Sequence, residues 1–157
     1  MAKHFKLTNE TKVNVFGVTL FRIECTIDCK WAKVGDKGGW VEKEDNLDGS
    51  AWVSGSAEVF GSAWVSGSAW VFGSARVFGS AWVSDEADYC CFQSFGSRYD
   101  TTTVFREKDG NLRVRCGCFN GTLEEFAAKV QLTHGDSKHG KVYKAIIEVI
   151  KLRFNVQ

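Results

Sequence analysis

The side chains best suited to binding chemistry recur every six residues through the middle of the chain. Between Gly49 and Ser84, six consecutive hexads read Gly-Ser-Ala-x-Val-y, where x is Trp, Glu or Arg and y is Ser or Phe. Aromatic rings bind planar or apolar groups by stacking and burial, and a neighbouring cation strengthens that recognition. The candidate residues for binding or for oligomerisation are therefore Trp52, Trp64, Trp70, Trp82, Phe60, Phe72, Phe78, Glu58 and Arg76.

The residue types that catalysis requires do not gather in the hexads. His4, His134 and His139 all lie outside them, and no loop interrupts residues 49–84. The repeated serines occupy corners without a base nearby, and three scattered histidines do not indicate a three-histidine zinc site. We therefore expect a protein that is not an enzyme, with no catalytic residue, no metal ion and no cofactor.

Six cysteines could form disulfides or bind a metal, but their spacing favours neither. The sequences Cys25-x-x-x-Cys29 and Cys116-Gly117-Cys118 both differ from the Cys-x-x-Cys spacing of zinc knuckles, and Cys90 and Cys91 are adjacent. We expect no secretory leader before them, and therefore reduced thiols that pack as small hydrophobic side chains. A disulfide and a four-cysteine metal site stay open as alternatives.

A second set of candidates lies in the C-terminal third of the chain. Arg106, Arg113 and Arg115 fall in a predicted β-hairpin, where Arg113 and Arg115 project from the same side of one strand. These three side chains could contact an anionic ligand, or they could be solvated surface charges.

The hexad itself predicts the element that positions the rings. A Gly-Ser corner followed by a short strand places Ala and Val inward and the residues flanking Val outward. Equivalent positions recur every eighteen residues and stack about 4.8 Å apart, which puts Trp64 over Trp82, Trp52 over Trp70, Phe60 over Phe78 and Glu58 next to Arg76.

The summed apolar surface of these outward rings exceeds the few hundred Å² of contiguous apolar surface that a monomer tolerates. Three covers could bury them: the chain's own C-terminal segment, a symmetric dimer or trimer, or a binding partner.

The pattern Ala-x-Val-x-Gly-Ser resembles the hexapeptide repeat of left-handed β-helix proteins, in which three hexads form one triangular coil. This resemblance implies a mostly β fold with a parallel β-helix of about three coils over residues 37–90. Proteins that resemble this one in the repeat include acyltransferases, carbonic anhydrases and pure binding proteins, so the repeat implies an architecture and not an activity.

The flanking segments predict caps for the two open ends of the β-helix. Residues 1–36 read as an N-terminal β cap with strands over residues 5–8, 12–16 and 19–26. Residues 91–157 read as an α+β module, with a hairpin over residues 99–119. A capping box at Thr122–Glu125 then opens one helix, and a second helix begins after His134-Gly135.

The whole layout resembles small proteins of bacteriophages and prophages. The shared features are a Gly-Gly-Trp-Val-Glu-Lys stretch before the repeats, a Thr-Val-Phe-Arg-x-Lys-Asp-Gly hairpin and a Gly-Thr-Leu-Glu-Glu-Phe helix start. This resemblance implies a phage accessory protein that neutralises a host defence component, of the anti-CRISPR type or another, in the bacterial cytoplasm. A protein that sequesters a nucleotide signal is the first alternative, and an enzyme similar to hexapeptide acyltransferases is the weakest.

The remaining expectations concern partners. A net charge of +1 gives no general field that would attract nucleic acid, and no apolar run approaches the length that spans a membrane. We expect self-association together with a host protein or a nucleotide signal as partner, and neither sequence-specific nucleic-acid binding nor a membrane.

Overall fold

The repeated Gly-Ser pairs turn the chain so sharply that each hexad contributes a strand of only two residues. In the computed structural model, which describes residues 3–157, the glycines at the hexad corners have positive φ, from +59° at Gly49 to +68° at Gly73. Glycine adopts this conformation without strain. The strands between these corners are β4 (Trp52–Val53), β5 (Glu58–Val59), β6 (Trp64–Val65), β7 (Trp70–Val71), β8 (Arg76–Val77) and β9 (Trp82–Val83).

Each of the first three hexad strands pairs in parallel with the strand eighteen residues later. Trp52 aligns with Trp70, Glu58 with Arg76, and Trp64 with Trp82. The valines of these strands are fully buried, and the alanines two residues before them are at most 2 % exposed. The predicted eighteen-residue register and the inward direction of Ala and Val are therefore confirmed.

The predicted fold class, a mostly β chain built around a parallel β-helix of about three coils, is wrong. The structure is mixed, with several small antiparallel and mixed sheets and two C-terminal helices, and no coiled parallel β-helix is evident in residues 3–157. The physical reason lies in the extent of pairing: each parallel pair of strands spans only two residues. The long strands of both flanks pair antiparallel.

The N-terminal segment adds three strands to the end of one hexad sheet. These strands are β1 (Phe5–Val13), β2 (Thr19–Cys25) and β3 (Lys37–Val41), and the sheet order is β1-β2-β3-β5-β8. Instead of two predicted strands at 5–8 and 12–16, β1 is one long strand whose register with β2 shifts between Leu7 and Thr11. Because β3 pairs antiparallel with β2 and parallel with β5, it joins the N-terminal hairpin to the hexads.

The C-terminal segment forms a four-stranded antiparallel sheet covered by two helices. Its strands are β10 (Tyr89–Phe95), β11 (Asp100–Arg106), β12 (Leu112–Cys116) and β13 (Phe119–Thr122), followed by α1 (Leu123–His134) and α2 (Lys138–Phe154). The predicted capping box is confirmed: Thr122 accepts from the Glu125 N–H at 3.1 Å, and the Glu125 carboxylate accepts from the Thr122 N–H at 2.8 Å. Sequence reasoning missed β10 and β13, the outer strands of this sheet.

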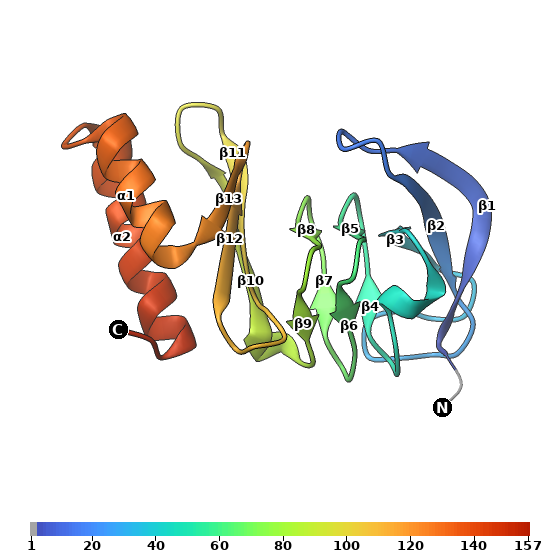
Figure 1. Cartoon of the computed structure of the whole chain (residues 1–157). Coiled ribbons are helices and arrows are strands. Elements are labelled where there is room, and N and C mark those ends of the chain that lie inside the picture. The colour runs from blue at the N-terminus through green and yellow to red at the C-terminus, as the bar shows by residue number, and fades with distance from the viewer. Residues whose placement is uncertain (1–2) are drawn as a thin grey trace.

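The molecule is layered, with the helices at one end, then the C-terminal sheet, the hexads and the N-terminal strands (Figure 1). Neighbouring residues of β11 show how the sheet serves two cores. Phe105 packs into the core of the hexads, whereas Val104 packs against the helices. The predicted boundaries at 36/37 and 90/91 stay predictions; β3 begins at Lys37, and β10 crosses the second boundary. Among residues 3–157, no helix is both long and apolar enough to cross a membrane.

Candidate functional site

Three of the predicted surface residues are buried within the chain. Trp52 is 2 % exposed, Phe60 5 % and Glu58 5 %. Trp52 lies against β3 so closely that a Cβ added at Gly38 would come within 2.7 Å of its Cζ2 atom. The expectation that these side chains form an open binding surface is therefore wrong, because the N-terminal segment covers them.

Two aromatic residues of the N-terminal segment provide much of this cover. The ring of Phe16, in the turn between β1 and β2, lies 5.8 Å from the rings of both Phe60 and Phe78. The indole of Trp31 stacks on Trp70 at 4.6 Å and donates a hydrogen bond from Nε1 to the carbonyl oxygen of Ser68 at 2.8 Å. This cover was not among the three alternatives that the sequence suggested.

One group of outward rings stays open on β6 and β9. The rings of Trp64 and Trp82 lie 4.2 Å apart, and Trp82 is 39 % exposed. The hairpin between β11 and β12 docks here, with the Lys108 N–H donating to the carbonyl oxygen of Ser80 at 3.0 Å, so that Nζ of Lys108 lies 5.7 Å from the Trp82 ring centroid. We call Trp64, Trp82 and Lys108 the indole patch.

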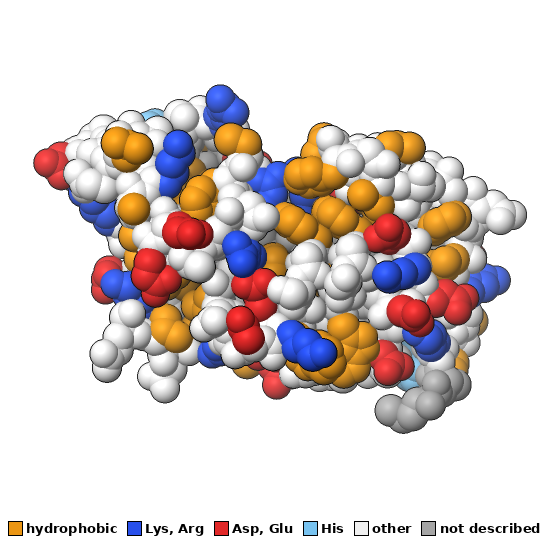
Figure 2. All heavy atoms as spheres, viewed as in Figure 1, with side chains coloured by type: hydrophobic (Ala, Val, Ile, Leu, Met, Phe, Trp, Pro, Cys, Tyr) orange, Lys and Arg blue, Asp and Glu red, His pale blue; other side chains and the backbone are white. Residues whose placement is uncertain are grey.

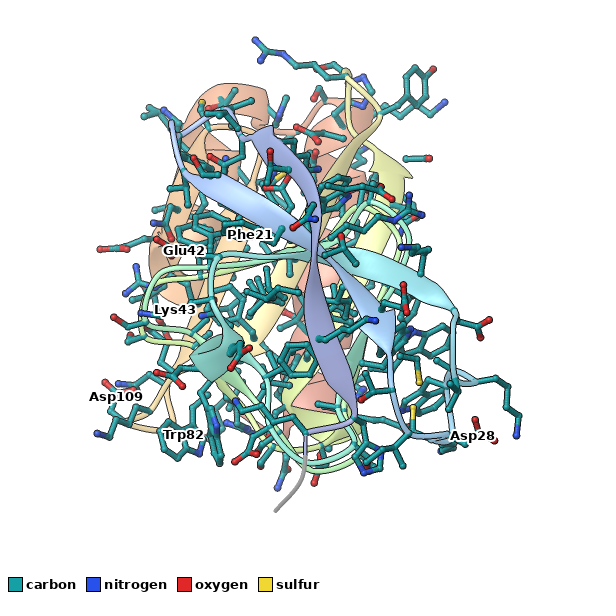
Figure 3. All side chains as sticks on the ribbon, turned by 90° about the vertical axis from the view of Figure 1, so that its right-hand side faces the viewer. Phe21, Asp28, Glu42, Lys43, Trp82 and Asp109 are labelled. Atoms are coloured by element: carbon teal, nitrogen blue, oxygen red, sulfur yellow. The ribbon has the colours of Figure 1, made fainter. Side chains whose placement is uncertain are left out.

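Charged side chains surround the indole patch. Figure 2 shows a hydrophobic group with a basic side chain against it in the lower centre, over β6 and β9. Figure 3 places Glu42, Lys43 and Asp109 along the same edge of the molecule as Trp82. The short 3-10 turn at Glu44–Asn46 adds exposed acidic groups, and Leu47 just after it bridges to Val65 of β6. The patch thus combines an apolar centre with a charged rim.

A second open feature is a cavity of about 280 Å³ between the hexads, β10 and α2. Phe72 is 38 % exposed and packs against Trp70 at 4.4 Å between ring centroids. Tyr89 meets Phe72 edge-on at 6.2 Å. Arg153 closes one side by donating to the carbonyl oxygen of Glu86 at 2.8 Å. We call this space the Phe72 cavity, and its lining residues are Trp70, Phe72, Glu86, Tyr89, Cys90, Cys91 and Arg153.

The Cys90 thiol and the Tyr89 phenol of this cavity are poor nucleophiles. Burial raises the pKa of the Cys90 thiol to about 11, and burial also raises the pKa of Tyr89, with the nearby Cys91 as a smaller cause. Both groups therefore stay protonated at neutral pH, and a thiol reacts as its thiolate. The cavity can take up an apolar or aromatic group, and neither Cys90 nor Tyr89 is an activated nucleophile there.

The predicted Glu58–Arg76 pair is confirmed, but as part of an interior cluster. The Glu58 carboxylate lies 3.0 Å from Nζ of Lys12 and 3.7 Å from Nε of Arg76, and it accepts a hydrogen bond from Asn14 at 3.3 Å. Trp40 aligns with Glu58 in the neighbouring strand. These contacts link the hexads to the N-terminal hairpin.

The three arginines of the C-terminal sheet differ in their contacts. Arg106 donates to the carbonyl oxygen of Phe154 at 2.9 Å, and Arg113 pairs with Glu107 at 3.1 Å. Arg115 is 7 % exposed and donates from Nη1 to the carbonyl oxygen of Phe119 at 3.1 Å. Arg106 and Arg113 therefore hold the fold together, whereas the buried Nε of Arg115 has no hydrogen-bond partner among residues 3–157.

The histidines and cysteines lie mainly in the C-terminal module. A cavity of about 240 Å³ between the sheet and α1 includes His134, Tyr143 and Cys116, with the Tyr143 hydroxyl 3.7 Å from the Cys116 sulfur. Burial and this thiol raise the pKa of Tyr143. Across residues 3–157, no three His, Cys, Asp or Glu side chains are grouped so that they could hold a metal ion. All six cysteines are free thiols.

Sequence patterns could not have revealed the Phe72 cavity, because its walls come from three elements that meet only in the folded chain. Phe72 and Trp70 were visible as repeat positions, whereas Tyr89 and Arg153 carried no signal. No protein-family model, no curated protein and no solved structure matches this chain.

Proposed function

We propose that this chain is a non-catalytic binding protein that contacts a partner protein through the indole patch and the Phe72 cavity. The observation that supports this proposal most strongly is that Trp82 and Phe72 stay 39 % and 38 % exposed, although neighbouring rings of the same repeat are covered by the N-terminal segment. Exposed aromatic side chains next to charged groups are typical of the residues that dominate binding energy at protein interfaces.

Covering the exposed part of Trp82 or Phe72 would contribute measurably to the free energy of binding. A Trp or Phe side chain carries roughly 150–250 Å² of surface, so covering the exposed fraction of either ring would contribute about 2 kcal/mol. The Phe72 cavity, at about 280 Å³, is slightly smaller than the roughly 300–1,000 Å³ of most small-molecule sites. A cavity of this size suits one anchoring side chain of a partner.

We further propose that the partner is a host defence protein and that binding neutralises it in the bacterial cytoplasm. This step rests on the resemblance of the layout to phage and prophage accessory proteins. The exposed acidic residues Glu44 and Asp45 near the indole patch favour a partner with basic groups beside an apolar anchor.

A nucleotide signal is the second candidate ligand, and one contact favours it. Nζ of Lys108 lies over the ring of Trp82 at 5.7 Å, so a cation stands beside a ring on which a base could stack. Self-association through the same rings is a further proposal.

The proposal is tested by capture from host lysate with four forms of the protein: wild type, Trp82→Ser, Phe72→Ser and Tyr99→Ser. Tyr99 is 77 % exposed and belongs to neither feature, so it is the matched control. We expect wild type and the control to retain the same host protein and at least one of the other two variants to lose it. Equal capture by all four forms would contradict the proposal.

Two further measurements separate the remaining partners. Tryptophan fluorescence on addition of cyclic dinucleotides reports a nucleotide ligand, because such a ligand would stack on Trp82 and change its emission. Sedimentation velocity reports self-association. Nucleotide binding without host-protein capture would replace the protein-binding proposal with the sequestering one.

A further inference from the structure

A small cavity lies where β8 meets the C-terminal sheet. Its volume is about 100 Å³, and it is lined by Ser74, Arg76, Asp100, Thr101, Thr103, Arg115 and Gly117. Liquid water occupies about 30 Å³ per molecule, so this space holds roughly three waters or one small tetrahedral anion. Figure 2 shows Lys or Arg side chains at the base of the notch between the two halves of the molecule.

Arg115 enters this cavity as a buried cation without a carboxylate partner. Its side chain makes the Nη1 contact to Phe119 already described, and its buried Nε has no hydrogen-bond partner in the described part of the chain. A guanidinium carries five N–H donors, and burying a charge without compensation is costly. Consistent with this, burial and the nearby charge of Arg76 lower the pKa of Arg115.

Arg76 is only partly neutralised. Its Nε lies 3.7 Å from the Glu58 carboxylate, which is closer to Lys12, at 3.0 Å. Asp100 also lines the cavity, and its Oδ1 accepts from the Thr101 N–H at 2.8 Å. Two guanidiniums and the single carboxylate of Asp100 therefore line this space, which leaves one positive charge uncompensated in the lining.

Hydroxyl groups complete the lining of the cavity, and one aromatic ring lies near both guanidiniums. Ser74 Oγ and Thr101 Oγ1 are hydrogen-bonded to each other across it. The ring of Phe16, 49 % exposed, lies 6.0 Å from the Arg76 guanidinium and 5.2 Å from that of Arg115. The lining thus presents two guanidiniums, one carboxylate and a hydrogen-bonded pair of hydroxyls around a space of anion size.

We propose that this cavity binds a phosphate group, which the guanidiniums of Arg76 and Arg115 contact through their N–H donors while the free hydroxyl hydrogen of the Ser74–Thr101 pair donates a further hydrogen bond. Guanidiniums recognise phosphate through charge-assisted, often bidentate, hydrogen bonds. The site is separate from the indole patch and from the Phe72 cavity, so it stands or falls independently of the function proposed above.

The test is isothermal titration of the folded protein with inorganic phosphate at constant ionic strength. We expect Arg76→Gln to weaken binding roughly 10- to 100-fold, as for the loss of a charged hydrogen bond. Removing the carboxylate by Asp100→Asn should tighten binding by about three- to tenfold, since one repulsive charge disappears. Lys33→Gln removes one positive charge from an exposed side chain that does not line the cavity, and it is the control.

The outcomes differ clearly. No heat of binding with phosphate or with adenosine monophosphate up to about 10 mM, or equal affinities for wild type and Arg76→Gln, would overturn the proposal. Because Arg115 is buried and its replacement could unfold the chain, the partly exposed Arg76 and Asp100 are the positions on which the test depends.

A second comparison identifies the source of the phosphate. A nucleotide would place its base against the exposed ring of Phe16, so adenosine monophosphate should then bind more tightly than inorganic phosphate, and Phe16→Ala should remove only that difference. Equal affinities for the two ligands, both lowered by Arg76→Gln, would identify a site for the phosphate group alone.

Discussion

At the scale of single residues, the chain uses its repeat positions for two different purposes. Glu58 and Trp82 occupy the same position of their hexads, yet Glu58 is 5 % exposed and Trp82 is 39 % exposed. The difference follows from the neighbours, because the β1–β2 hairpin contacts Glu58 and leaves Trp82 open. Repeat position alone therefore does not determine the role of a side chain.

Replacement of Glu58 by Gln should destabilise the fold strongly. The substitution leaves Lys12 and Arg76 facing each other without their shared carboxylate, and we expect a loss of about 3 kcal/mol in the free energy of unfolding. Glu10→Gln, which breaks an exposed pair with Arg22, should cost about 1 kcal/mol or less. Urea denaturation of both variants measures this difference, and equal losses would contradict the interior role of Glu58.

The half-buried thiol of Cys90 should make stability fall at alkaline pH. Its pKa is raised from the ordinary 9.0 to about 11 in the folded chain, so the unfolded chain loses the proton first as pH rises. Stability is then full below pH 9 and declines toward pH 11. In denaturation curves across this range, Cys90→Ala should show a shallower decline than wild type, whereas the exposed Cys118→Ala should match wild type. Identical slopes for all three would refute this assignment.

At the scale of elements, the hexads depend on glycine at each corner, but not equally. Gly67 and Gly79 have φ values of +63° and +67°. A Cβ at Gly67 would collide with the backbone carbonyl oxygen of Ser84, whereas a Cβ at Gly79 meets no described atom within 4 Å. Alanine substitution at both positions therefore separates two free-energy costs. Gly79→Ala reports the cost of the left-handed backbone conformation alone, and Gly67→Ala adds the cost of the steric clash.

Gly79→Ala should cost about 1–2 kcal/mol, the usual penalty for a left-handed alanine. Gly67→Ala should cost several kcal/mol more or prevent folding, because its neighbour is rigid backbone. Thermal unfolding of the two variants provides the measurement. If both variants lower the melting temperature equally, the close approach between Gly67 and the backbone of Ser84 is absent.

The elements also show how far the sequence could predict the structure. The helix beginning at Leu123, the inward valines and the eighteen-residue register follow from local periodicity and capping, and all were predictable. The fold class was not, because the repeat suggested a long parallel stack, while the strands it forms are only two residues long. The cover provided by Phe16 and Trp31 and the neighbours of Arg115 depend on contacts between distant segments, which periodicity does not encode.

At the scale of the whole molecule, layering decides which rings stay available to a partner. The N-terminal strands close one end of the hexads and the C-terminal sheet closes the other, as Figure 1 shows. Trp52 lies under the first of these layers and Trp82 beside the second. Of these two equivalent indoles of the repeat, Trp52 is therefore an interior residue and Trp82 is a surface residue.

Two matched substitutions test this arrangement. Trp52→Ser removes a ring that is 2 % exposed and should cost about 3–5 kcal/mol, whereas Trp82→Ser should leave the unfolding midpoint nearly unchanged. Circular dichroism during urea denaturation distinguishes the two. A large loss for Trp82→Ser would show that this ring stabilises the fold and is not reserved for a partner.

The most direct test of the binding account is photo-crosslinking from the position of Trp82. A photoreactive phenylalanine analogue introduced there, and separately at Tyr99 as a control, would be irradiated in host cells that produce the protein. The account predicts a discrete adduct with one host protein from position 82 and none from position 99. The absence of any adduct at position 82, or the same adducts from both positions, would contradict it.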